Sequence, residues 1–532
     1  MERFDYVIVG GGSAGCVLAS RLSEDPSVRV CLVEAGPAKQ HWSIDMPAGI
    51  IKTMTDRKHN WMFETEPQAR LDNRRLYWPR GKVMGGSSAI NAMVYIRGNR
   101  ADYDRWAGAE GCPGWGWDEV LPYFRRAENN ERFQDDLHGV GGPLNVADLR
   151  SPNPLTGIFV QAAAETQLPV LDDFNGPRQE GAGLYQVTQK DGNRMSAFRA
   201  YLADVVRPNL KIVDMAQATR VEIDHGRASC VAYRRGGREE TVAAEREIIL
   251  CGGAVNSPQL LMLSGIGPGA ELQRHGIAVV ADRAGVGANL QDHLDVSLVQ
   301  KTVTKLGFAF TPAGFAMIPK AIRDYRRNRT GLLTSNYAEG GLFAKSDPAL
   351  DLPDLQYHFL PVLVNDHGRK RIYAHGMTMH CCDLRPKSRG RIGLKSPDPL
   401  AAPLIDPNYL DHADDMAKLK RGLALARRIF SAPALNAHAG EELFPGAAVQ
   451  SDAEVERFIR SKAETIYHPV GTCRMGSDAD AVVDPQLRVR GVDGLRVVDA
   501  SVMPSLIGGN TNAPTIMIAE RAADLIRGRI AA

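Results

Sequence analysis

Short apolar runs that end in glycine or an acidic residue recur along this chain, and each predicts a buried strand. The first run occupies residues 6–9 and leads into GGGSAG and then CVLASRL, which has the composition of a helix. A second run, VRVCLV, ends directly before Glu34. Continuous apolar runs of this length are typical of parallel strands that are buried on both faces. The pattern therefore predicts an α/β sheet in which strands alternate with helices.

The same pattern returns in the middle and near the end of the chain. Residues 246–255 (REIILCGGAV) predict another strand, and residues 257–267 predict a short helix with Pro258 at its first position, where proline is favoured. Residues 494–504 (GLRVVDASVMP) again place an acid after a strand, and APTIMIAERAADLIRGRI has the apolar spacing of an amphipathic helix. Between these units, LQYHFLP and GRIGLKS have the alternating pattern of strands in an antiparallel sheet.

Nucleotide-binding units thus occur at both ends and in the middle of the chain, which predicts a discontinuous domain. We assign residues 1–155, 210–300 and 465–532 to a Rossmann-like nucleotide-binding domain of the α/β class. Residues 156–209 and 301–464 are predicted to form an inserted substrate-binding domain, built on an antiparallel sheet flanked by helices. The architecture is then α+β overall, and 532 residues are enough for two domains with a large core.

The glycines after the first strand have the spacing of a dinucleotide-binding turn. Gly10 allows the turn, Gly12 lets a phosphate approach the backbone, and Gly15 lets the helix pack on the strand. The helix that follows presents its N-terminal N–H groups to a pyrophosphate. Glu34 lies 24 residues after Gly10, near the spacing expected for a carboxylate that binds a ribose hydroxyl. The motif by itself does not distinguish NAD from FAD.

Composition narrows the class of protein. A formal net charge of +2 gives no electrostatic basis for binding nucleic acid. We expect no transmembrane helix, because no uninterrupted apolar run is long enough, and no signal peptide, because Met1 is followed by charged residues and then directly by the first strand. The eight cysteines contain no CxxC pair and several lie in apolar runs, so we expect reduced thiols and a cytoplasmic protein.

One segment suggests contact with a membrane. Residues 306–318 (LGFAFTPAGFAMI) are apolar but interrupted by glycine and proline, and a basic cluster follows at Lys320, Arg323, Arg326, Arg327 and Arg329. An apolar wedge beside a basic cluster is typical of proteins that rest on an anionic bilayer. One hypothesis is therefore peripheral contact of residues 306–329 with the inner face of the cell membrane. The alternative is a cap or hydrophobic substrate channel with a solvated basic helix behind it.

Five longer motifs are specific enough to identify a family. They are the N-terminal glycine motif, GKVMGGSSAINAMVYIRG, GAVNSPQLLMLSGIG, YHPVGTCRMG and GNTNAPT. With these motifs the chain resembles the glucose-methanol-choline (GMC) flavin oxidoreductases over essentially its whole length. It is most similar to the bacterial medium-chain alcohol dehydrogenases that use a non-oxygen acceptor, and to their polyethylene-glycol and choline relatives. The stretches VNDHGRK and CDLRPKSRGRIGLKS favour the aliphatic-alcohol group.

The resemblance implies FAD as the cofactor. It places the pyrophosphate loop at Gly10, Gly12, Ser13, Ala14 and Gly15, and the adenosine ribose at Glu34 and Ala35. It places the segment that follows the pyrophosphate and flavin ring at Val83, Gly85, Gly86, Ser87, Asn91, Ala92 and Val94. The remaining contacts are an adenine-side position at Val221, a second pyrophosphate contact at Asp499 and Ala500, and the flavin ring beside Asn512 and Ala513.

The attachment of the flavin departs from part of the family. Some members bind the flavin covalently through a histidine that lies two residues after the Ser-Ser pair. In this chain that position is Ile90, between Ala89 and Asn91, so no nucleophile is available there. We therefore predict a non-covalent FAD.

Oxidation of an alcohol requires a base for the hydroxyl proton and a hydride acceptor. His468 is the candidate base, because a neutral imidazole is suited to accept a proton near neutral pH. Asn512, 44 residues later, is the candidate partner, whose amide would donate to the developing alkoxide. The resemblance supports this pair, and we interpret Asn510 as a turn former. For Tyr467, a place in the substrate pocket and a place in the core both remain open.

A second cluster has residue types that bind metals. His375, His380, Cys381, Cys382 and Asp383 lie close together in sequence. Adjacent cysteines in a strand point to opposite faces, so they are poorly placed to bind one ion. We therefore predict strand packing and no metal.

These observations predict FAD-dependent oxidation of primary alcohols, most simply uncharged aliphatic ones, to aldehydes, with electrons passed to a quinone-type acceptor. One alternative is an oxidase that uses oxygen with an aryl, furan or choline-type alcohol, and another is a flavin-containing lyase. A pyridine-nucleotide dehydrogenase is disfavoured by the glycine loop at residues 81–86 and by Asp499, and a non-catalytic binding protein by the presence of both His468 and Asn512. The oligomeric state is left open.

Overall fold

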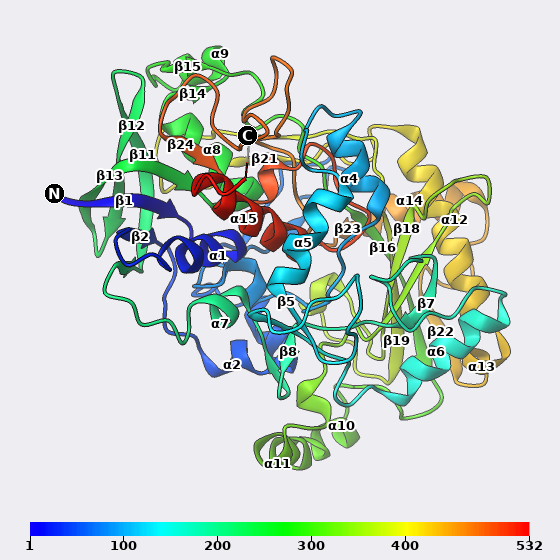
Figure 1. Cartoon of the computed structure of the whole chain (residues 1–532). Coiled ribbons are helices and arrows are strands. Elements are labelled where there is room, and N and C mark those ends of the chain that lie inside the picture. Colours follow the sequence, from blue (N-terminus) through cyan, green and yellow to red (C-terminus); the bar gives the residue numbers. More distant parts are fainter. Residues whose placement is uncertain (531–532) are drawn as a thin grey trace.

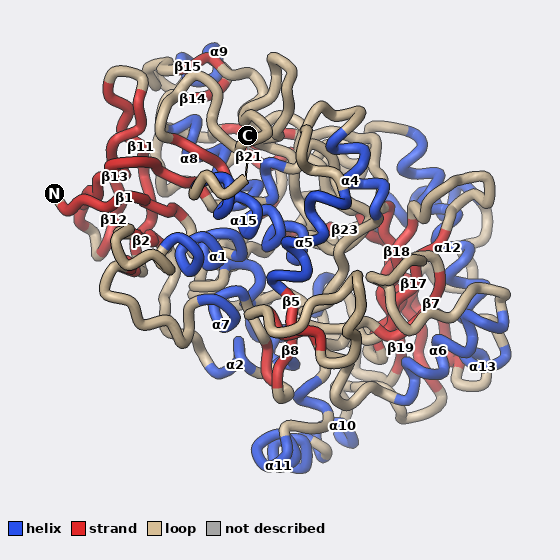
Figure 2. Tube along the Cα trace, in the orientation of Figure 1, coloured by secondary structure: helices blue, strands red, loops and turns tan. Residues whose placement is uncertain are grey.

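Two large sheets with helices on their faces form the framework of the computed structural model, which describes residues 1–530 (Figures 1 and 2). The first sheet has seven strands in the order β10-β2-β1-β13-β12-β11, with β24 paired to β13. The arrangement confirms the predicted α/β class. Its strands are β1 (Glu2–Val9), β2 (Val30–Val33), β10 (Leu210–Val213), β11 (Ala216–Asp224), β12 (Arg227–Arg235), β13 (Arg238–Leu250) and β24 (Leu495–Val497).

The parallel half of the first sheet follows from its apolar runs. β1 pairs in parallel with β2 and β13, so that Val9 lies opposite both Val33 and Leu250. The side chains of Val7 and Ile8 are fully buried, as expected for a strand covered on both faces. α1 (Ser13–Leu22) connects β1 to β2 and packs beside α15 (Asn512–Ile526), which closes the chain (Figure 1). The predicted strand, turn, helix and strand at the N-terminus is confirmed.

The second sheet is antiparallel and also has seven strands. Helices α6 (Pro154–Glu165) and α12 (Ala413–Phe430) pack on one of its faces. The opposite face carries His358 and His380, which lie directly across from each other in the strand register. The strands, in spatial order, are β22 (Ala439–Phe444), β16 (Leu294–Thr302), β19 (Gly376–Asp383), β18 (Leu355–Leu360), β17 (Gly340–Ala344) and β7 (Gly181–Leu184), and β23 (Glu464–Thr465) pairs with β16.

The pairing of strands bears on where the two predicted domains meet. The first sheet takes its strands from residues 2–33, 210–250 and 495–497. β16 belongs to the second sheet, although we had assigned its residues up to 300 to the nucleotide-binding domain. An edge near residue 293 therefore describes the strand pairing better, and the division into two domains stays a prediction.

The predicted helix at residues 257–267 is misplaced. The helix α8 spans Gly253–Leu263, so Pro258 lies inside it and not at its first position. Two distant residues make this possible. Asp499 accepts hydrogen bonds from the backbone N–H of Gly253 (2.8 Å) and the hydroxyl of Ser257 (2.6 Å), which fixes the helix N-terminus. The Thr472 hydroxyl donates to the Ala254 carbonyl (2.7 Å), which a proline four residues later cannot reach.

The cysteine cluster of β19 is packing, as predicted. Cys381 belongs to the main core, where it lies against α12, whereas Cys382 belongs to a separate core cluster with Phe343 and Leu384. The two side chains therefore point to opposite faces of the sheet. All eight cysteines are free thiols and are buried. Within residues 1–530, no helix combines the length and the apolar character needed to cross a membrane.

Candidate active site

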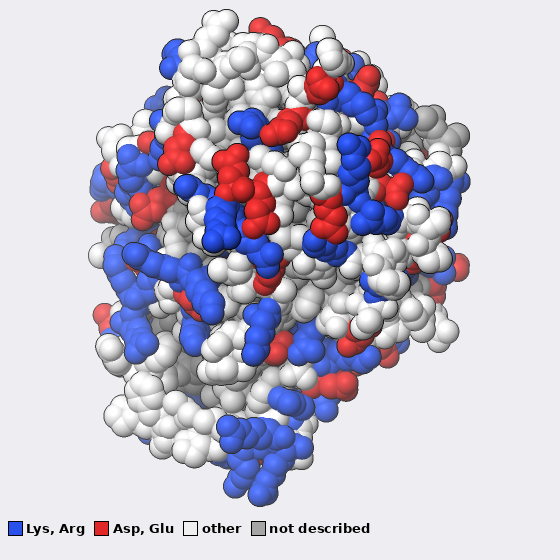
Figure 3. Space-filling view, turned by 90° about the vertical axis from the view of Figure 1, so that its left-hand side faces the viewer, with Lys and Arg blue, Asp and Glu red and all other residues white. Residues whose placement is uncertain are grey.

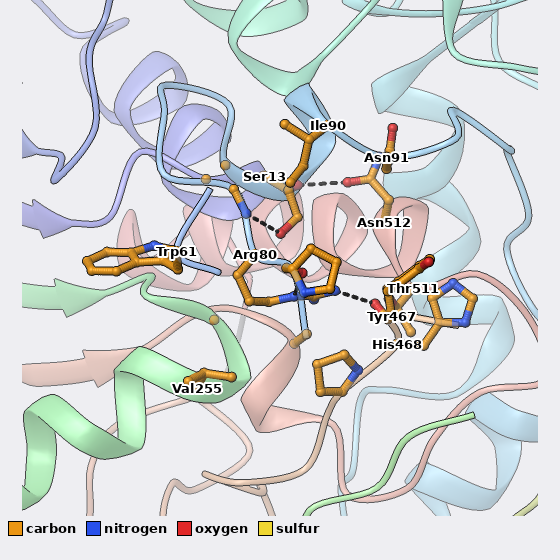
Figure 4. Close-up of a pocket in the computed structure, with 18 of the residues that line it drawn as sticks. Ser13, Trp61, Arg80, Ile90, Asn91, Val255, Tyr467, His468, Thr511 and Asn512 are labelled. Atoms are coloured by element: carbon orange, nitrogen blue, oxygen red, sulfur yellow. Dashed lines mark hydrogen bonds between the residues drawn. The ribbon is translucent and has the colours of Figure 1, made fainter. Parts of the chain in front are cut away.

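A cavity of about 420 Å³ lies where the carboxyl ends of the parallel strands face the second sheet. Val9, Val33 and Leu250, the last residues of β1, β2 and β13, all line it. The loop at residues 79–94 and the C-terminal motifs contribute further walls (Figure 4). Ligands of open α/β sheets bind at this edge of the strands. One end of the cavity is therefore built as a nucleotide site and the other end faces the antiparallel sheet.

The glycine turn shapes the nucleotide end. Gly10, Gly12, Ser13 and Ala14 line the cavity, and no side chain caps the N-terminus of α1. Its N–H groups are therefore left for a phosphate. Gly86 approaches the turn so closely that a Cβ on it would lie 2.7 Å from the Cα of Gly12. The two glycine loops thus form a cradle, and their close approach requires glycine at position 86.

Glu34 and Ala35 line the cavity beyond the turn. The Glu34 carboxylate accepts hydrogen bonds from the N–H groups of Gly11 and Gly36, both at 2.7 Å. Burial nevertheless raises the pKa of Glu34 to about 7. The adjoining wall comes from β11, where residues 216–218 line the cavity. The carboxylate therefore lies in the cavity wall beyond the glycine turn, and its contact with a ribose stays a prediction.

Val221, our predicted adenine-side residue, does not reach the cavity. It is buried, and its N–H donates to the Ser264 hydroxyl (2.9 Å). The pairing of β11 with β12 is irregular between Ala218 and Arg220, which changes the faces to which later residues point. Residues 216–218 of the same strand line the cavity instead, and no local sequence signal reveals this shift.

The other predicted cofactor residues divide into two groups. Gly86, Ser87, Asn91, Ala92, Val94, Asp499 and Ala500 line the cavity. Gly15, Val83, Gly85 and Ala513 do not line it. They support the residues that do: Val83 packs with Ile90, and Gly85 packs against Ser196 and Phe198. Asp499 lines the cavity, but its carboxylate already accepts hydrogen bonds from the Gly253 N–H, the Ser257 hydroxyl and the Ser501 N–H. It therefore mainly holds these neighbouring segments in place.

His468 lies at the other end of the cavity and is 8% exposed. The backbone N–H of His468 donates to the Asp292 carboxylate (2.7 Å), and the preceding residue, Tyr467, has a φ of +75°. Such a backbone is strained for a bulky residue. Arg80 helps to hold it by donating to the Tyr467 carbonyl (2.8 Å; Figure 4), and the Tyr467 N–H donates to the Thr465 hydroxyl (2.8 Å). Hydrogen bonds to the backbone of Tyr467 and His468 thus fix the position from which the imidazole extends.

Hydrogen bonds assign the tautomer of His468. Nε2 of His293 lies 3.2 Å from the Leu384 carbonyl, which can only accept, so this nitrogen carries a proton. Burial lowers the pKa of His293 to about 3, so its Nδ1 is unprotonated. Nδ1 of His468 lies 2.9 Å away and must donate to it. Nε2 of His468 is then the bare nitrogen, and it accepts from the Asn510 amide (3.1 Å).

The electrostatic surroundings keep His468 neutral. Burial is the largest effect that lowers its pKa well below the ordinary value, and the neighbouring His293, His358 and Arg80 lower it further. A neutral imidazole with a bare Nε2 can accept a proton from a bound hydroxyl. The prediction of a base at this position is therefore compatible with the geometry.

Of the two asparagines in GNTNAPT, the one that contacts His468 is Asn510, whereas we predicted Asn512. Asn510, which we interpreted as a turn former, contacts His468 Nε2, and its Oδ1 accepts from Gln356 (3.0 Å). Asn512 lines the same cavity, but its Oδ1 accepts from the Ser13 hydroxyl (2.7 Å; Figure 4). Asn512 is the first residue of α15, whereas Asn510 precedes the helix. Sequence spacing alone does not tell which of the two faces the histidine.

Tyr467 lines the cavity, and its contact with a substrate stays a prediction. Its hydroxyl is hydrogen-bonded to Nδ1 of His367, and His367 Nε2 lies 3.0 Å from Glu464. Burial lowers the pKa of His367 to about 3 and raises the pKa of Glu464 to about 7. Across residues 1–530, Asp366, His367 and Glu464 form the only group with ligand atoms close enough to share one ion. Sequence reasoning did not find this group.

The second sheet supplies a polar wall that sequence reasoning also missed. Asp295, His358 and His380 line the cavity. Asp295 hydrogen-bonds His380 and raises its pKa, although burial opposes this. Burial lowers the pKa of His358 to about 3. Alternation in LQYHFLP was a usable signal for His358, but only the register of the strands joins it to His380.

Apolar side chains complete the cavity on the side away from the nucleotide end. They are Ile50, Ile51, Met54, Phe310, Leu360, Val362, Leu363 and Val364. The space beside His468 is therefore suited to a small molecule with one hydroxyl and an apolar remainder.

Comparison with known proteins agrees with this arrangement. Two family models described as GMC oxidoreductase match residues 4–295 and 386–519. An alcohol dehydrogenase [acceptor] of Pseudomonas putida is 53% identical over 531 residues, covering 98% of this chain and 95% of that protein. The mitochondrial choline dehydrogenase of Homo sapiens is 44% identical, covering 99% and 90%. A crystal structure of pyridoxine 4-oxidase from Mesorbium loti superposes with a TM-score of 0.89 at 34% identity, covering 98% of both chains.

Proposed function

Because this chain belongs to the GMC oxidoreductase family, we propose that it oxidises primary, uncharged aliphatic alcohols to aldehydes with FAD and passes the electrons to a quinone-type acceptor. The observation that carries the proposal is the bare, buried Nε2 of His468. It faces a cavity whose opposite end has the uncapped N-terminus of α1 and Glu34.

The residues present fit FAD. The diphosphate would lie against α1 and the Gly12–Gly86 cradle, with the ribose toward Glu34. Ile90 lines the cavity where a covalent link would need a histidine, which supports a non-covalent cofactor. When bound, FAD supplies the hydride acceptor.

The protein supplies the proton acceptor and the orientation. Nε2 of His468 accepts the proton of the substrate hydroxyl, and His293 holds the imidazole in the tautomer that this requires. The lone pair of Nε2 accepts from the Asn510 amide in this structure. A substrate hydroxyl would take the place of that amide, which would then lie within reach of the substrate oxygen. Asn512, with its carbonyl held by Ser13, would direct its amide N–H groups to the developing alkoxide. Asn510 and Asn512 thus share the role that we first gave to Asn512 alone.

The charge of the cavity favours an uncharged alcohol. The charge of Asp295 is balanced by His380, and burial keeps much of Glu464 neutral near pH 7. A quaternary ammonium group would therefore find no unpaired anion, whereas an alkyl chain would contact Met54, Phe310 and Leu363. The second candidate is a choline-type substrate, because Asp295 and Glu464 both line the cavity.

An anaerobic titration tests this proposal. Butanol, octanol, benzyl alcohol, choline and a glycol oligomer are each added to the holoenzyme while the visible flavin absorption is recorded. We expect bleaching with the aliphatic alcohols and little with choline. Absence of bleaching with every alcohol would favour the lyase. Turnover with an artificial quinone, compared with oxygen consumption, then separates a dehydrogenase from an oxidase.

The pH dependence of flavin reduction is a further prediction. The base must be unprotonated, and burial together with His293, His358 and Arg80 lowers its pKa below the ordinary value of about 6.5. The rate of anaerobic reduction is therefore expected to be constant at neutral pH and to fall only on acidification below that value. A fall in the reduction rate near pH 7 that persists in the Glu464→Gln variant would contradict the lowered pKa of His468. A fall near pH 7 that disappears in this variant would be due to titration of the Glu464 carboxyl.

The cellular location is part of the same proposal. The eight cysteines are free and buried, which supports a reducing compartment such as the cytoplasm.

A further inference from the structure

A helical hairpin projects from the body of the protein at the bottom of Figure 1. It consists of α10 (Pro312–Ala316) and α11 (Ile318–Asn328). Ala321 and Tyr325 are the only buried residues of these two helices, and the Tyr325 hydroxyl anchors the hairpin by donating to Asn193 (2.8 Å). Four large apolar side chains are exposed by 40–57%: Phe315, Met317, Ile318 and Ile322. Isolated apolar side chains on a surface are normal, but four on one projecting hairpin form a patch.

Basic side chains border this apolar patch. α11 carries Lys320, Arg323, Arg326 and Arg327 against a single acid, Asp324. Asp324 pairs with Lys320 (2.5 Å) and lies 3.5 Å from Arg323. Within residues 1–530, Arg326 and Arg327 have no salt-bridge partner. Figure 3 shows the resulting cluster of Lys and Arg at the bottom of the molecule, beside uncharged atoms.

The order of residues on α11 separates the two kinds of side chain. Ile318, Ile322 and Arg326 follow one another at four-residue intervals, so they form one strip along the helix. Arg323 and Arg327 form the neighbouring strip, farther from the buried Ala321 and Tyr325. An apolar strip bordered by long cationic side chains is the pattern of a helix that lies in the plane of a membrane surface.

The hairpin lies at the apolar end of the cavity. Phe310, two residues before α10, lines the cavity, and the Arg371 guanidinium lies over its ring at 5.2 Å. α11 packs against residues 332–334, and these pack against residues 47–49. Directly after them comes α3 (Ile50–Thr53), whose Ile51 both lines the cavity and is 42% exposed. The hairpin is therefore linked to the cavity wall through these packed segments.

We propose that the α10–α11 hairpin is a membrane-docking surface for an anionic bilayer. Phe315, Met317, Ile318 and Ile322 insert among the headgroups, and the guanidinium groups of α11 contact lipid phosphates. Charge complementarity identifies the occupant, because the patch combines unpaired cations with apolar side chains in one strip. Docking in this orientation turns the apolar end of the cavity toward the lipid. If the proposed function holds, alcohols and quinones dissolved in the membrane then reach the site directly.

Co-sedimentation with vesicles tests the docking without any turnover. The holoenzyme is mixed at low salt with vesicles of phosphatidylcholine alone or of phosphatidylcholine and phosphatidylglycerol in equal amounts. We expect sedimentation only with the anionic vesicles, and a loss of binding on addition of salt. The double variant Arg326→Glu, Arg327→Glu is expected to bind at least about tenfold more weakly, with unchanged flavin absorption and unchanged reduction by butanol.

Matched controls separate the patch from net charge. Arg234→Glu with Arg238→Glu changes the charge by the same amount on the exposed β12–β13 hairpin, and should sediment like the wild type. Phe315→Ser with Met317→Ser should weaken binding without any change in charge. The proposal is overturned if the wild type does not sediment with anionic vesicles, or if both reversed pairs bind equally. It is also overturned if Phe315→Ser with Met317→Ser converts a dimer to a monomer and leaves vesicle binding intact.

Discussion

Replacing His468 with alanine is expected to lower the rate of flavin reduction by alcohol at least about a hundredfold, the usual scale for loss of a general base. The reason is the bare Nε2, which in this structure is the nitrogen directed at Asn510 and the cavity. His293 cannot replace it, because its Nε2 proton is held by the Leu384 carbonyl and its side chain does not line the cavity. Anaerobic stopped-flow measurement of flavin bleaching gives the rate.

Two observations make this result interpretable. The flavin absorption of the variant should equal that of the wild type, since no contact at the nucleotide end involves His468. The control is His225→Ala, at a turn where the imidazole is 96% exposed, and it should leave the rate unchanged. Near-normal reduction by the His468 variant with a full complement of FAD would show that the proton leaves to another group. A loss of flavin would instead assign His468 a role in folding.

Much of the nucleotide end was predictable from the sequence because its signals are local. A continuous apolar strand, the glycine turn and the helix after it lie within residues 6–22, and the structure has them there. Glu34 was predictable for the same reason, since it directly follows the next strand of the parallel sheet. In each case the backbone itself makes the site, so residue type and spacing are sufficient information.

The end of the cavity that holds His468 was predictable only in part, because it is assembled from distant segments. His468 was found through its motif, but its partners come from residues 293, 358 and 510 and depend on strand register and on the end of a loop. Val221 lies outside the cavity, contrary to the prediction, because an irregularity in β11 changes the face of the sheet to which later residues point. The predicted first residue of α8 was wrong because Asp499, far along the chain, fixes the N-terminus of that helix. Each of these depends on a tertiary contact that no local pattern contains.

Gly15→Ala is expected to give a protein with little or no bound FAD. An alanine Cβ at this position would lie 1.8 Å from the Gly10 carbonyl oxygen, far inside contact distance. Gly15 is in α1, where alanine is intrinsically better than glycine by about 1 kcal/mol. The clash outweighs this gain, because overpacking a rigid site costs about 1–3 kcal/mol or more, and here the obstacle is backbone that is held by β1. The helix must move away from the turn, which opens the phosphate cradle.

Gly157→Ala is the matched control for that experiment. Gly157 lies in α6, and a Cβ there would meet no atom within 4 Å. The same substitution should therefore raise the free energy of unfolding by about 0.4–1 kcal/mol and leave the flavin content unchanged. The ratio of visible flavin absorption to protein absorption in the purified variants decides the comparison. If Gly15→Ala retains its flavin as well as Gly157→Ala does, the close approach of helix and turn is not what holds the cofactor, and the assignment of the diphosphate to this loop loses its physical basis.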